Sequence, residues 1–145
     1  MAFNSIYRTV LGADVGTAGP EFTLVYSSAH WCMPCRQFTP ILKEVYSEWL
    51  MSGERVEIIF VSSDRNEDQF HLYSATMPWQ ILPFQERKLA DAYRDEYRVS
   101  SIPSLLVFDA NGHLVTSNGR QTVRERKGQA LDVWRKEVLV RESYQ

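Results

Sequence analysis

Hydrophobic residues along the chain follow two spacings, one typical of buried strands and one typical of amphipathic helices. Residues 22–26 and 55–61 are short runs rich in β-branched and aromatic side chains, which favour strands buried on both faces. Between them, apolar residues recur every three or four positions, as on one buried face of a helix, at Phe38, Ile41, Leu42, Val45, Tyr46, Trp49 and Leu50. Gly53 is placed to end this helix. This order predicts a βαβ unit with parallel strands.

The pattern before residue 22 is weaker. Ile6, Val10 and Leu11 suggest a first edge strand, and residues 12–20, with three glycines and a proline, have the composition of a flexible connection. We therefore expect the main part of the sheet to begin at Phe22.

The second half of the chain predicts two more helices and a hairpin. The helices are expected over residues 67–76 and 86–97, with an irregular segment at 77–84 between them. Apolar runs at 105–108 and 113–116 flank an Asn-Gly pair, the strongest hairpin signal in the chain. The sheet is therefore expected to end in an antiparallel pair.

A final amphipathic helix is expected beyond Arg120, because apolar residues there follow a helical spacing at Ala130, Leu131, Val133, Trp134 and Val138. We expect this helix to cover one face of the sheet. Residues 120–127 carry mixed charges and are expected to form a solvated surface.

Length and charge indicate one domain over residues 1–145 with no nucleic-acid or membrane partner. The formal net charge is −2, and basic residues are interspersed with acidic ones, unlike a phosphate-binding surface. No apolar run approaches the roughly 20 residues that span a bilayer, and residues 1–16 lack the pattern of a secretory signal. We expect a soluble protein of the cytoplasm, with the nucleus as the alternative location.

The only two cysteines lie in the segment Trp31-Cys32-Met33-Pro34-Cys35, where the first strand gives way to the helix. The unpaired N–H groups and the dipole at a helix N-terminus favour a thiolate on the first sulfur. Cys32 is therefore predicted to be the accessible nucleophile, and Cys35, one turn further on, the resolving thiol. This chemistry needs no bound cofactor.

Two other roles for the cysteines stay open. They could form a buried reduced pair, or half of a zinc site, because thiolates with this spacing are also common metal ligands. His30, His71 and His113 show no ligand spacing relative to one another, so the single chain offers no complete set of four ligands. We therefore predict no metal, and zinc would require a dimer.

Three separated blocks of the chain, together with the segment that holds the dithiol, resemble known proteins. The segment from Trp31 to Arg36, Pro40 inside the helix and Ser101-Ile102-Pro103 before a strand together resemble a thioredoxin fold. Residues 38–40, 57–65 and 77–84 resemble the tryparedoxin and nucleoredoxin branch, and residues 118–126 are most similar to nucleoredoxin-like proteins. The resemblance implies an α/β fold with a central mixed β-sheet flanked by helices on both faces.

The resemblance also implies a docking surface beside the cysteines. The bond between Ile102 and Pro103 would be cis, and the main chain of Ile102 would pair with an extended segment of a partner. The residues expected to bind substrate are Trp31, Met33, Pro34, Ile102, Pro103 and Trp79.

Three positions depart from the pattern of the branch. Met33 replaces a proline, His30 replaces a small residue, and Tyr26 stands where thioredoxins have a buried aspartate that assists proton transfer. A protonated His30 near the sulfur would favour the Cys32 thiolate. Because tyrosine is not an anion near neutral pH, proton movement at Cys35 must rely on water or another group.

These observations predict a thiol-disulfide oxidoreductase that reduces disulfides in partner proteins and is regenerated by an external dithiol or reductase. The alternative is a redox-sensitive binding or regulatory module of the nucleoredoxin-like type with little turnover. A peroxidase is less favoured, because nothing in the sequence identifies an activated site for the peroxide oxygen.

Overall fold

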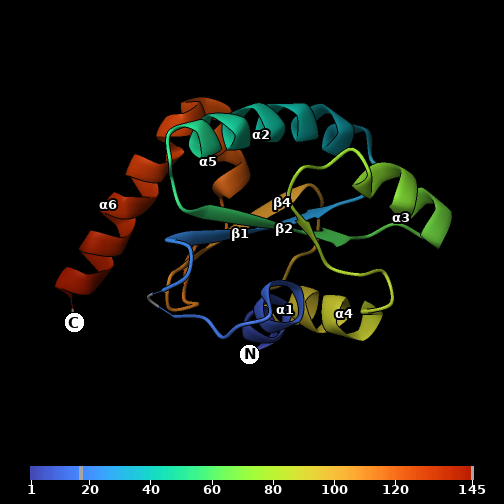
Figure 1. The fold of residues 1–145 in the computed structure, drawn as a ribbon, viewed down its shortest axis with the longest axis horizontal. Helices are drawn as coiled ribbons and strands as arrows, with labels where there is room; N and C mark the ends of the chain where they lie inside the picture. Colours follow the sequence, from blue (N-terminus) through green and yellow to red (C-terminus); the bar gives the residue numbers. More distant parts are fainter. Residues whose placement is uncertain (17, 145) are drawn as a thin grey trace.

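A five-stranded mixed sheet forms the centre of the computed structural model, which describes residues 1–16 and 18–144 (Figure 1). The strand order is β3-β2-β1-β4-β5, with β1 parallel to β2 and antiparallel to β4. The strands are β1 (Phe22–Ser28), β2 (Val56–Ser62), β3 (Gln80–Ile81), β4 (Ser104–Asp109) and β5 (Leu114–Thr116). The predicted βαβ unit and the closing antiparallel hairpin are both confirmed.

Helices cover both faces of this sheet (Figure 1). One face packs against α2 (Met33–Met51), α3 (Glu67–Ser74), α5 (Gly119–Arg126) and the first turns of α6 (Ala130–Ser143). The other face packs against α1 (Ala2–Leu11) and α4 (Arg87–Glu96). The side chains of β1 alternate between these two cores: Leu24 and Tyr26 enter the first core, and Val25 enters the second.

The prediction of an edge strand near Ile6, Val10 and Leu11 is wrong, because these residues belong to α1. Phe3, Ile6 and Tyr7 are buried against the sheet, and their three-and-four spacing is that of a helix face. The spacing of Phe3, Ile6, Tyr7 and Val10 was therefore the informative pattern, rather than the three aliphatic residues alone.

Helix α2 continues through Pro40 and ends where Gly53 was expected to end it. Gly53 has a φ of 73°, and the N–H of Glu54 returns to the carbonyl of Trp49 at 2.9 Å. This arrangement is the C-terminal motif for which glycine is preferred, because other residues are strained at positive φ.

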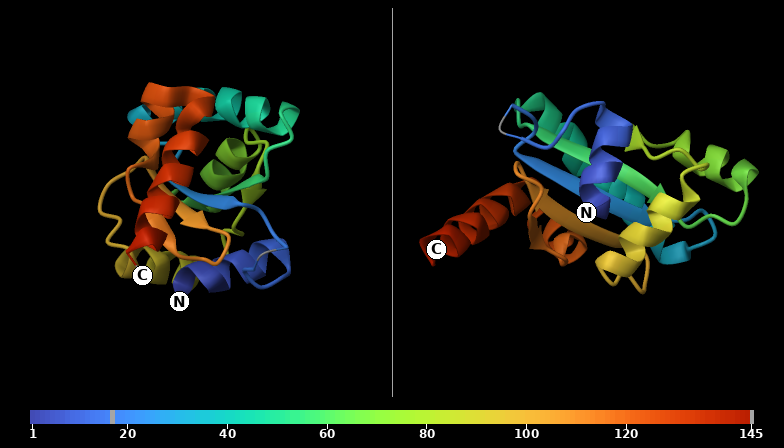
Figure 2. Two further views of the ribbon diagram at one scale, coloured as in Figure 1. Left: turned by 90° about the vertical axis from the view of Figure 1, so that its left-hand side faces the viewer. Right: turned by 90° about the horizontal axis from the view of Figure 1, so that it is seen from below.

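The C-terminal elements differ from the prediction in two respects. Residues 119–126 form the helix α5, which was not predicted, and Val123 is buried in the first core while most of the helix keeps a solvated surface. The first turns of α6 bury Trp134 as expected, but its C-terminal half projects beyond the body of the molecule (Figure 2), and Leu139 there is 67% exposed. Among the described residues, no helix is both long and apolar enough to cross a membrane.

Candidate active site

The two cysteines lie where β1 gives way to α2, at one end of the sheet. Cys32 is the N-cap residue of α2, and its sulfur accepts a hydrogen bond from the backbone N–H of Cys35 at 3.3 Å. Both residues are free thiols. Cys32 retains 6% of its surface and Cys35 none, so Cys32 is the more accessible sulfur.

The loop before β4 packs directly against Cys32. The bond between Ile102 and Pro103 is cis, in agreement with the resemblance. The Cys32 thiol donates to the carbonyl oxygen of Ile102 at 3.8 Å, and the Ile102 side chain packs on the cluster of Ala29, Cys32 and Cys35. Ile102 and Pro103 are therefore placed beside the thiols, as the sequence predicted.

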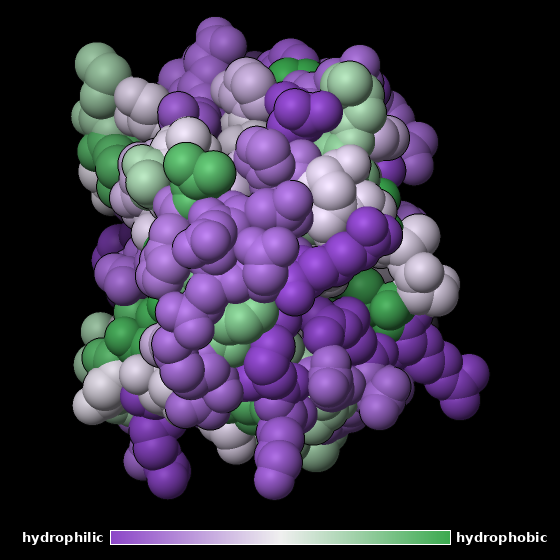
Figure 3. Space-filling view, turned by 90° about the vertical axis from the view of Figure 1, so that its right-hand side faces the viewer, coloured by the Kyte–Doolittle hydropathy of each residue, from purple (hydrophilic) through white to green (hydrophobic). Residues whose placement is uncertain are grey.

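Exposed side chains flank Cys32 along the chain. Trp31 is 43% exposed and Met33 is 57% exposed, and Pro34 is exposed next to them. The indole N–H of Trp31 donates to the carbonyl of Ser63 at 3.1 Å, and the guanidinium of Arg65 lies 4.8 Å from the centre of the ring. Figure 3 shows this end of the molecule as a largely hydrophilic face with separate hydrophobic patches.

Trp79 does not share this surface. It is 6% exposed and lies in the first core, with its ring edge-on to Tyr26 at 6.0 Å and to Tyr46 at 5.7 Å. The substrate-binding role expected for Trp79 is therefore corrected to a packing role, because a side chain buried among aromatic rings offers little surface to a partner.

Asp64 fixes the loop that carries His30 and Trp31. Its carboxylate accepts the backbone N–H of His30 at 2.7 Å and the hydroxyl of Ser62 at 2.8 Å, and the residue is 5% exposed. The ring of His30 lies edge-on to Tyr73, with 5.9 Å between the ring centres. The sequence placed Asp64 in a polar loop and missed this anchoring role.

Four buried hydroxyl groups lie behind Cys35. They belong to Tyr26 and Ser28 on β1, Thr39 on α2 and Tyr73 on α3. Their oxygens are joined by hydrogen bonds of 2.7 to 3.2 Å, and the hydroxyls of Thr39 and Tyr26 also reach the carbonyl of Cys35 at 2.9 and 3.3 Å. The side chain of Ser28 lies close enough to the Cys35 thiol to lower its pKa, against the larger effect of burial. We call these four groups the hydroxyl ring.

Burial keeps the groups around Cys35 neutral. The pKa of Cys35 is raised to about 12, mainly by burial and next by the hydrogen bond with Cys32. Burial likewise raises the pKa of Tyr26 and of Tyr73 above the ordinary value of tyrosine. The resolving thiol is therefore protonated near neutral pH and needs help to ionise.

The sequence missed most of the hydroxyl ring, although two signals were present. Tyr26 and Ser28 are two positions apart on a strand and therefore lie on the same face of it. Thr39 lies four residues after Cys35 on the helix, so these two residues also share a face. Tyr73 gave no signal, because it reaches the ring only through the packing of α3 on the sheet.

A cavity of about 650 Å³ lies beside Pro103. Its lining includes Arg98, Arg120 and Arg124, and none of the described residues that line it is acidic. The ion pairs within the described part of the chain use other arginines, namely Arg8, Arg94, Arg135 and Arg141. The cavity is therefore suited to a negatively charged group.

No group of three or more histidine, cysteine, aspartate or glutamate side chains gathers into a candidate metal site within residues 1–16 and 18–144. The dithiol is accompanied instead by a cis-proline loop and neutral hydroxyls.

A family model described as thioredoxin-like matches residues 19–114, which include the dithiol and the cis-proline loop. The chain belongs to the thioredoxin-like family. Within this family its relatives are nucleoredoxins and tryparedoxins. The resemblance to this branch and the thioredoxin-like α/β fold, with its mixed sheet between two helical layers, are both confirmed.

The relatives differ in how much of their length this thioredoxin-like chain covers. Nucleoredoxin from Bos taurus is 42% identical over 99 residues, which are 68% of this chain and 23% of that protein. The chain thus spans about a quarter of the length of such nucleoredoxins. Tryparedoxin from Trypanosoma brucei brucei is 36% identical over 125 residues, covering 86% of this chain and 83% of the relative.

Solved structures agree with this placement. Tryparedoxin from Trypanosoma brucei superposes with a TM-score of 0.76 at 33% identity, covering 84% of this chain and 85% of that one. A tryparedoxin II complexed with glutathionylspermidine has a TM-score of 0.77 at 28% identity, covering 89% of this chain and 95% of that one. Together with the Cys-x-x-Cys pair, these relatives support a thiol redox function of the general thioredoxin kind.

Proposed function

We propose that the protein is a protein-disulfide reductase in which Cys32 attacks and Cys35 resolves. The observation that carries this proposal is the position of Cys32 at the N-cap of α2, where the N–H of Cys35 points at its sulfur. A hydrogen-bond donor and the positive end of a helix both favour the thiolate, which is the attacking form. The more accessible sulfur attacks first and the buried sulfur completes the exchange.

The reaction proceeds through a mixed disulfide. The Cys32 thiolate attacks one sulfur of a partner disulfide and releases the other as a thiolate. Cys35 then attacks the Cys32 sulfur, which forms the Cys32–Cys35 bridge and releases the second partner thiol. An external dithiol or reductase returns two electrons to the bridge, so continued turnover requires a reducing compartment such as the cytosol or the nucleus.

The partner segment docks across the exposed residues around Cys32. Trp31 and Met33 flank Cys32 along the chain and offer apolar surface, and the loop of Ile102 and Pro103 lies against its sulfur. Because proline has no backbone N–H, Pro103 leaves the approach to the sulfur free of a competing donor. The main chain of Ile102 supports an extended segment in the manner of a short added strand.

The cavity beside Pro103 extends this surface to partners that carry a negative charge. Its three arginines and its lack of acidic lining residues favour a carboxylate next to the reacting disulfide. The tryparedoxin II structure with glutathionylspermidine supports a small peptide thiol as an electron donor or substrate. We propose that the carboxylate of a partner segment, rather than a polyamine, enters this cavity.

Trapping the mixed disulfide tests this proposal. The Cys35→Ser variant, incubated with insulin, is expected to retain insulin on Cys32 through a mixed disulfide, seen by intact-protein mass spectrometry and released by dithiothreitol. The matched Cys32→Ser variant is expected to form no adduct, because Cys35 is fully buried. Failure of Cys35→Ser to form an adduct would contradict the scheme, and a partner bound equally well by Cys32→Ser would favour the binding module.

A further inference from the structure

The hydroxyl ring is a closed circuit of four hydrogen bonds. Ser28 contacts Tyr73 at 2.7 Å, Tyr73 contacts Thr39 at 2.7 Å, and Thr39 contacts Tyr26 at 2.7 Å. The circuit closes where the Ser28 hydroxyl donates to Tyr26 at 3.2 Å, its longest contact. All four residues are buried, with between 0% and 4% of their surface exposed.

The number of protons in this ring limits what it can do. Each hydroxyl has one proton to donate and can also accept. The Thr39 and Tyr26 hydroxyls can also give this proton to the carbonyl of Cys35, at 2.9 and 3.3 Å. If instead the four donate in one direction around the ring, from Ser28 to Tyr26, Thr39, Tyr73 and back to Ser28, every hydroxyl oxygen donates once and accepts once, and the bonds to that carbonyl are given up. No proton then points at the Cys35 sulfur, which suits a neutral thiol that carries its own proton.

One rotation changes this arrangement. If the Ser28 hydroxyl turns from Tyr26 towards the nearby Cys35 sulfur, the ring opens at its longest contact. The remaining bonds keep their direction, so Tyr26 donates to Thr39, Thr39 to Tyr73, and Tyr73 to Ser28. A chain of four donors then ends on the sulfur, and each bond in such a chain strengthens the next.

We propose that this hydroxyl ring stabilises the Cys35 thiolate during the resolving step by opening at Ser28. In the opened ring Ser28 is the group that donates to the reacting sulfur, whereas Tyr73, Thr39 and Tyr26 position and polarise it. Neutral donors take the place of the buried carboxylate found in thioredoxins. The inference rests on the proposed function, because it concerns the second half of the same exchange.

The atoms and charges of this step balance. Cys35 loses its proton, its sulfur attacks the Cys32 sulfur of the mixed disulfide, and the bond from Cys32 to the partner sulfur breaks. The partner leaves as a thiolate and takes up the proton, so one disulfide and one thiol become a new disulfide and a new thiol. The ring gains and loses no proton; Ser28 turns towards the sulfur while it is anionic and returns once the bridge has formed.

The two steps can be followed separately with the chromogenic disulfide 5,5′-dithiobis(2-nitrobenzoate) at an equimolar concentration in a stopped-flow instrument. Attack by Cys32 releases the first thionitrobenzoate in a second-order phase, and resolution by Cys35 releases the second in a first-order phase. The variants to compare are Ser28→Ala, Tyr73→Phe and Tyr26→Phe. Tyr93→Phe is the matched control, because Tyr93 is buried on the other face and its hydroxyl has no partner among the described residues.

The inference predicts a graded effect on the second phase alone. Ser28→Ala should slow it about tenfold, because a hydrogen bond to a charged sulfur is lost. Tyr73→Phe should slow it about threefold and Tyr26→Phe less than about twofold, because these donors act through one or more intermediates. The first phase and the Tyr93→Phe control should match the wild type.

The pH profile separates chemistry from loss of packing. Among the described residues, the titratable groups that contact Cys35 or the hydroxyl ring are Cys32, Tyr26, Tyr73 and His30, whose ring lies edge-on to Tyr73. Cys32 is blocked in the mixed disulfide, so the profile of the second phase reports Cys35. In Ser28→Ala this profile should move about one pH unit upward, since a tenfold change in ionisation equals one unit.

Two results would overturn the inference. A Ser28→Ala variant with a normal first phase and a second phase within twofold of the wild type at every pH would show that the hydroxyl does not assist resolution. If the slowing of the second phase followed the loss of thermal stability of each variant, and not the order Ser28, Tyr73, Tyr26, the ring would have a structural role. An absent first phase in the wild type would instead contradict the proposed reductase function itself.

Discussion

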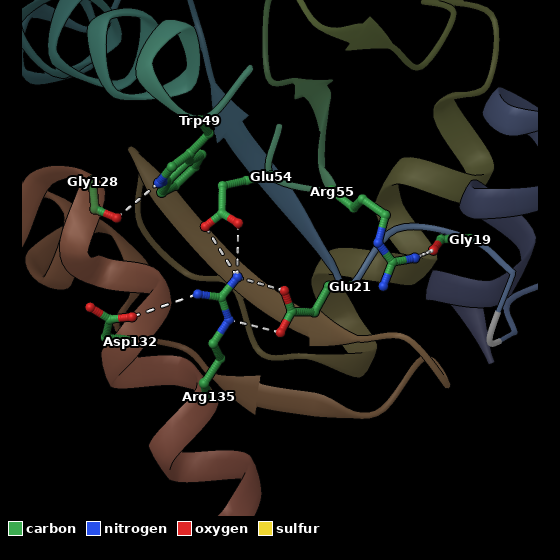
Figure 4. A network of polar contacts seen from close by, with 8 residues as sticks. All are labelled: Gly19, Glu21, Trp49, Glu54, Arg55, Gly128, Asp132 and Arg135. Carbon is green, nitrogen blue, oxygen red and sulfur yellow. Dashed lines mark hydrogen bonds and ion pairs between the residues drawn. The ribbon is translucent and has the colours of Figure 1, made fainter. Parts of the chain in front are cut away.

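The two ends of β1 hold their neighbours with different kinds of polar contact. Before the strand, the guanidinium of Arg135 binds both oxygens of Glu21 at 2.8 and 2.9 Å and reaches Glu54 at 3.2 Å (Figure 4). Asp132 adds a fourth charge at 3.6 Å. After the strand, the polar groups behind Cys35 are four hydroxyls without a formal charge.

The difference follows from solvent access and from the chemistry at each end. The side chains of Arg135, Glu21 and Glu54 are each about a third exposed, so the charges that join α6 to the sheet stay partly hydrated. The hydroxyl ring is buried, where an unpaired charge would be costly. A fixed carboxylate there would also oppose a thiolate on Cys35, whereas hydroxyls can serve both protonation states by rotating. One end is built to hold α6, and the other to accommodate a change of charge.

The largest expected effect comes from the core at the charged end. Trp134 is fully buried and lies edge-on to Phe22 and Trp49, with ring centres 5.9 and 6.0 Å away. Trp134→Ala should lower the free energy of unfolding by about 3–5 kcal/mol, because it leaves a large cavity. Denaturant unfolding measures this loss, with Trp134→Phe as the milder control. If the folded variant attacked disulfides through Cys32 at a changed rate, the two ends of β1 would not be independent.

A smaller effect is expected for the docking surface. Trp31→Ala should lower kcat/KM for insulin reduction about tenfold, since an exposed aromatic anchor beside the thiol is lost. Attack on the small chromogenic disulfide should change much less, because that molecule needs little docking surface. Trp31→Phe keeps a ring but loses the hydrogen bond to Ser63. Equal losses with both substrates would argue that Trp31 acts on the thiol and not on docking.

The smallest effect belongs to the ion pairs of Arg135. The hydrogen bond from Arg135 holds the pKa of Glu21 below its ordinary value, so this pair stabilises the fold above that value and stops doing so as the pH falls through the lowered pKa. Arg135→Met should therefore cost about 1 kcal/mol or less near pH 7. Comparing wild type and variant by thermal unfolding from pH 7 to pH 3 measures the difference. A difference that persists in acid would assign the effect to packing of the aliphatic stem.

The elements predicted with most success were those in which local pattern and tertiary environment agree. The run at 55–61 and the repeat from Phe38 to Trp49 predicted β2 and α2, because buried strands and helix faces leave a direct trace in the sequence. The Asn-Gly pair likewise predicted the hairpin. The position of Cys32 and Cys35 at the start of α2 was predictable because an apolar run precedes them and the helical repeat follows.

The remaining features depended on packing that no short window contains. Residues 119–126 form α5 with little apolar pattern, since Val123 is among the few of them that are buried. The sequence motif around Trp79 led us to expect it at the docking surface. In the structure it is buried in the core, where its ring packs against Tyr26 and Tyr46. Tyr73 meets Ser28 across 45 positions of the chain. Such contacts arise only once the helices are placed on the sheet.

The most direct test of the central claim is dithiothreitol-driven reduction of insulin by the purified protein beside its Cys32→Ser variant, with the zinc content determined on the same samples. The account predicts activity in the wild type, none above background in the variant, and no stoichiometric zinc. A wild type that is inactive, or equal to Cys32→Ser, would contradict a reductase function, and stoichiometric zinc in that sample would point to a metal site at the dithiol.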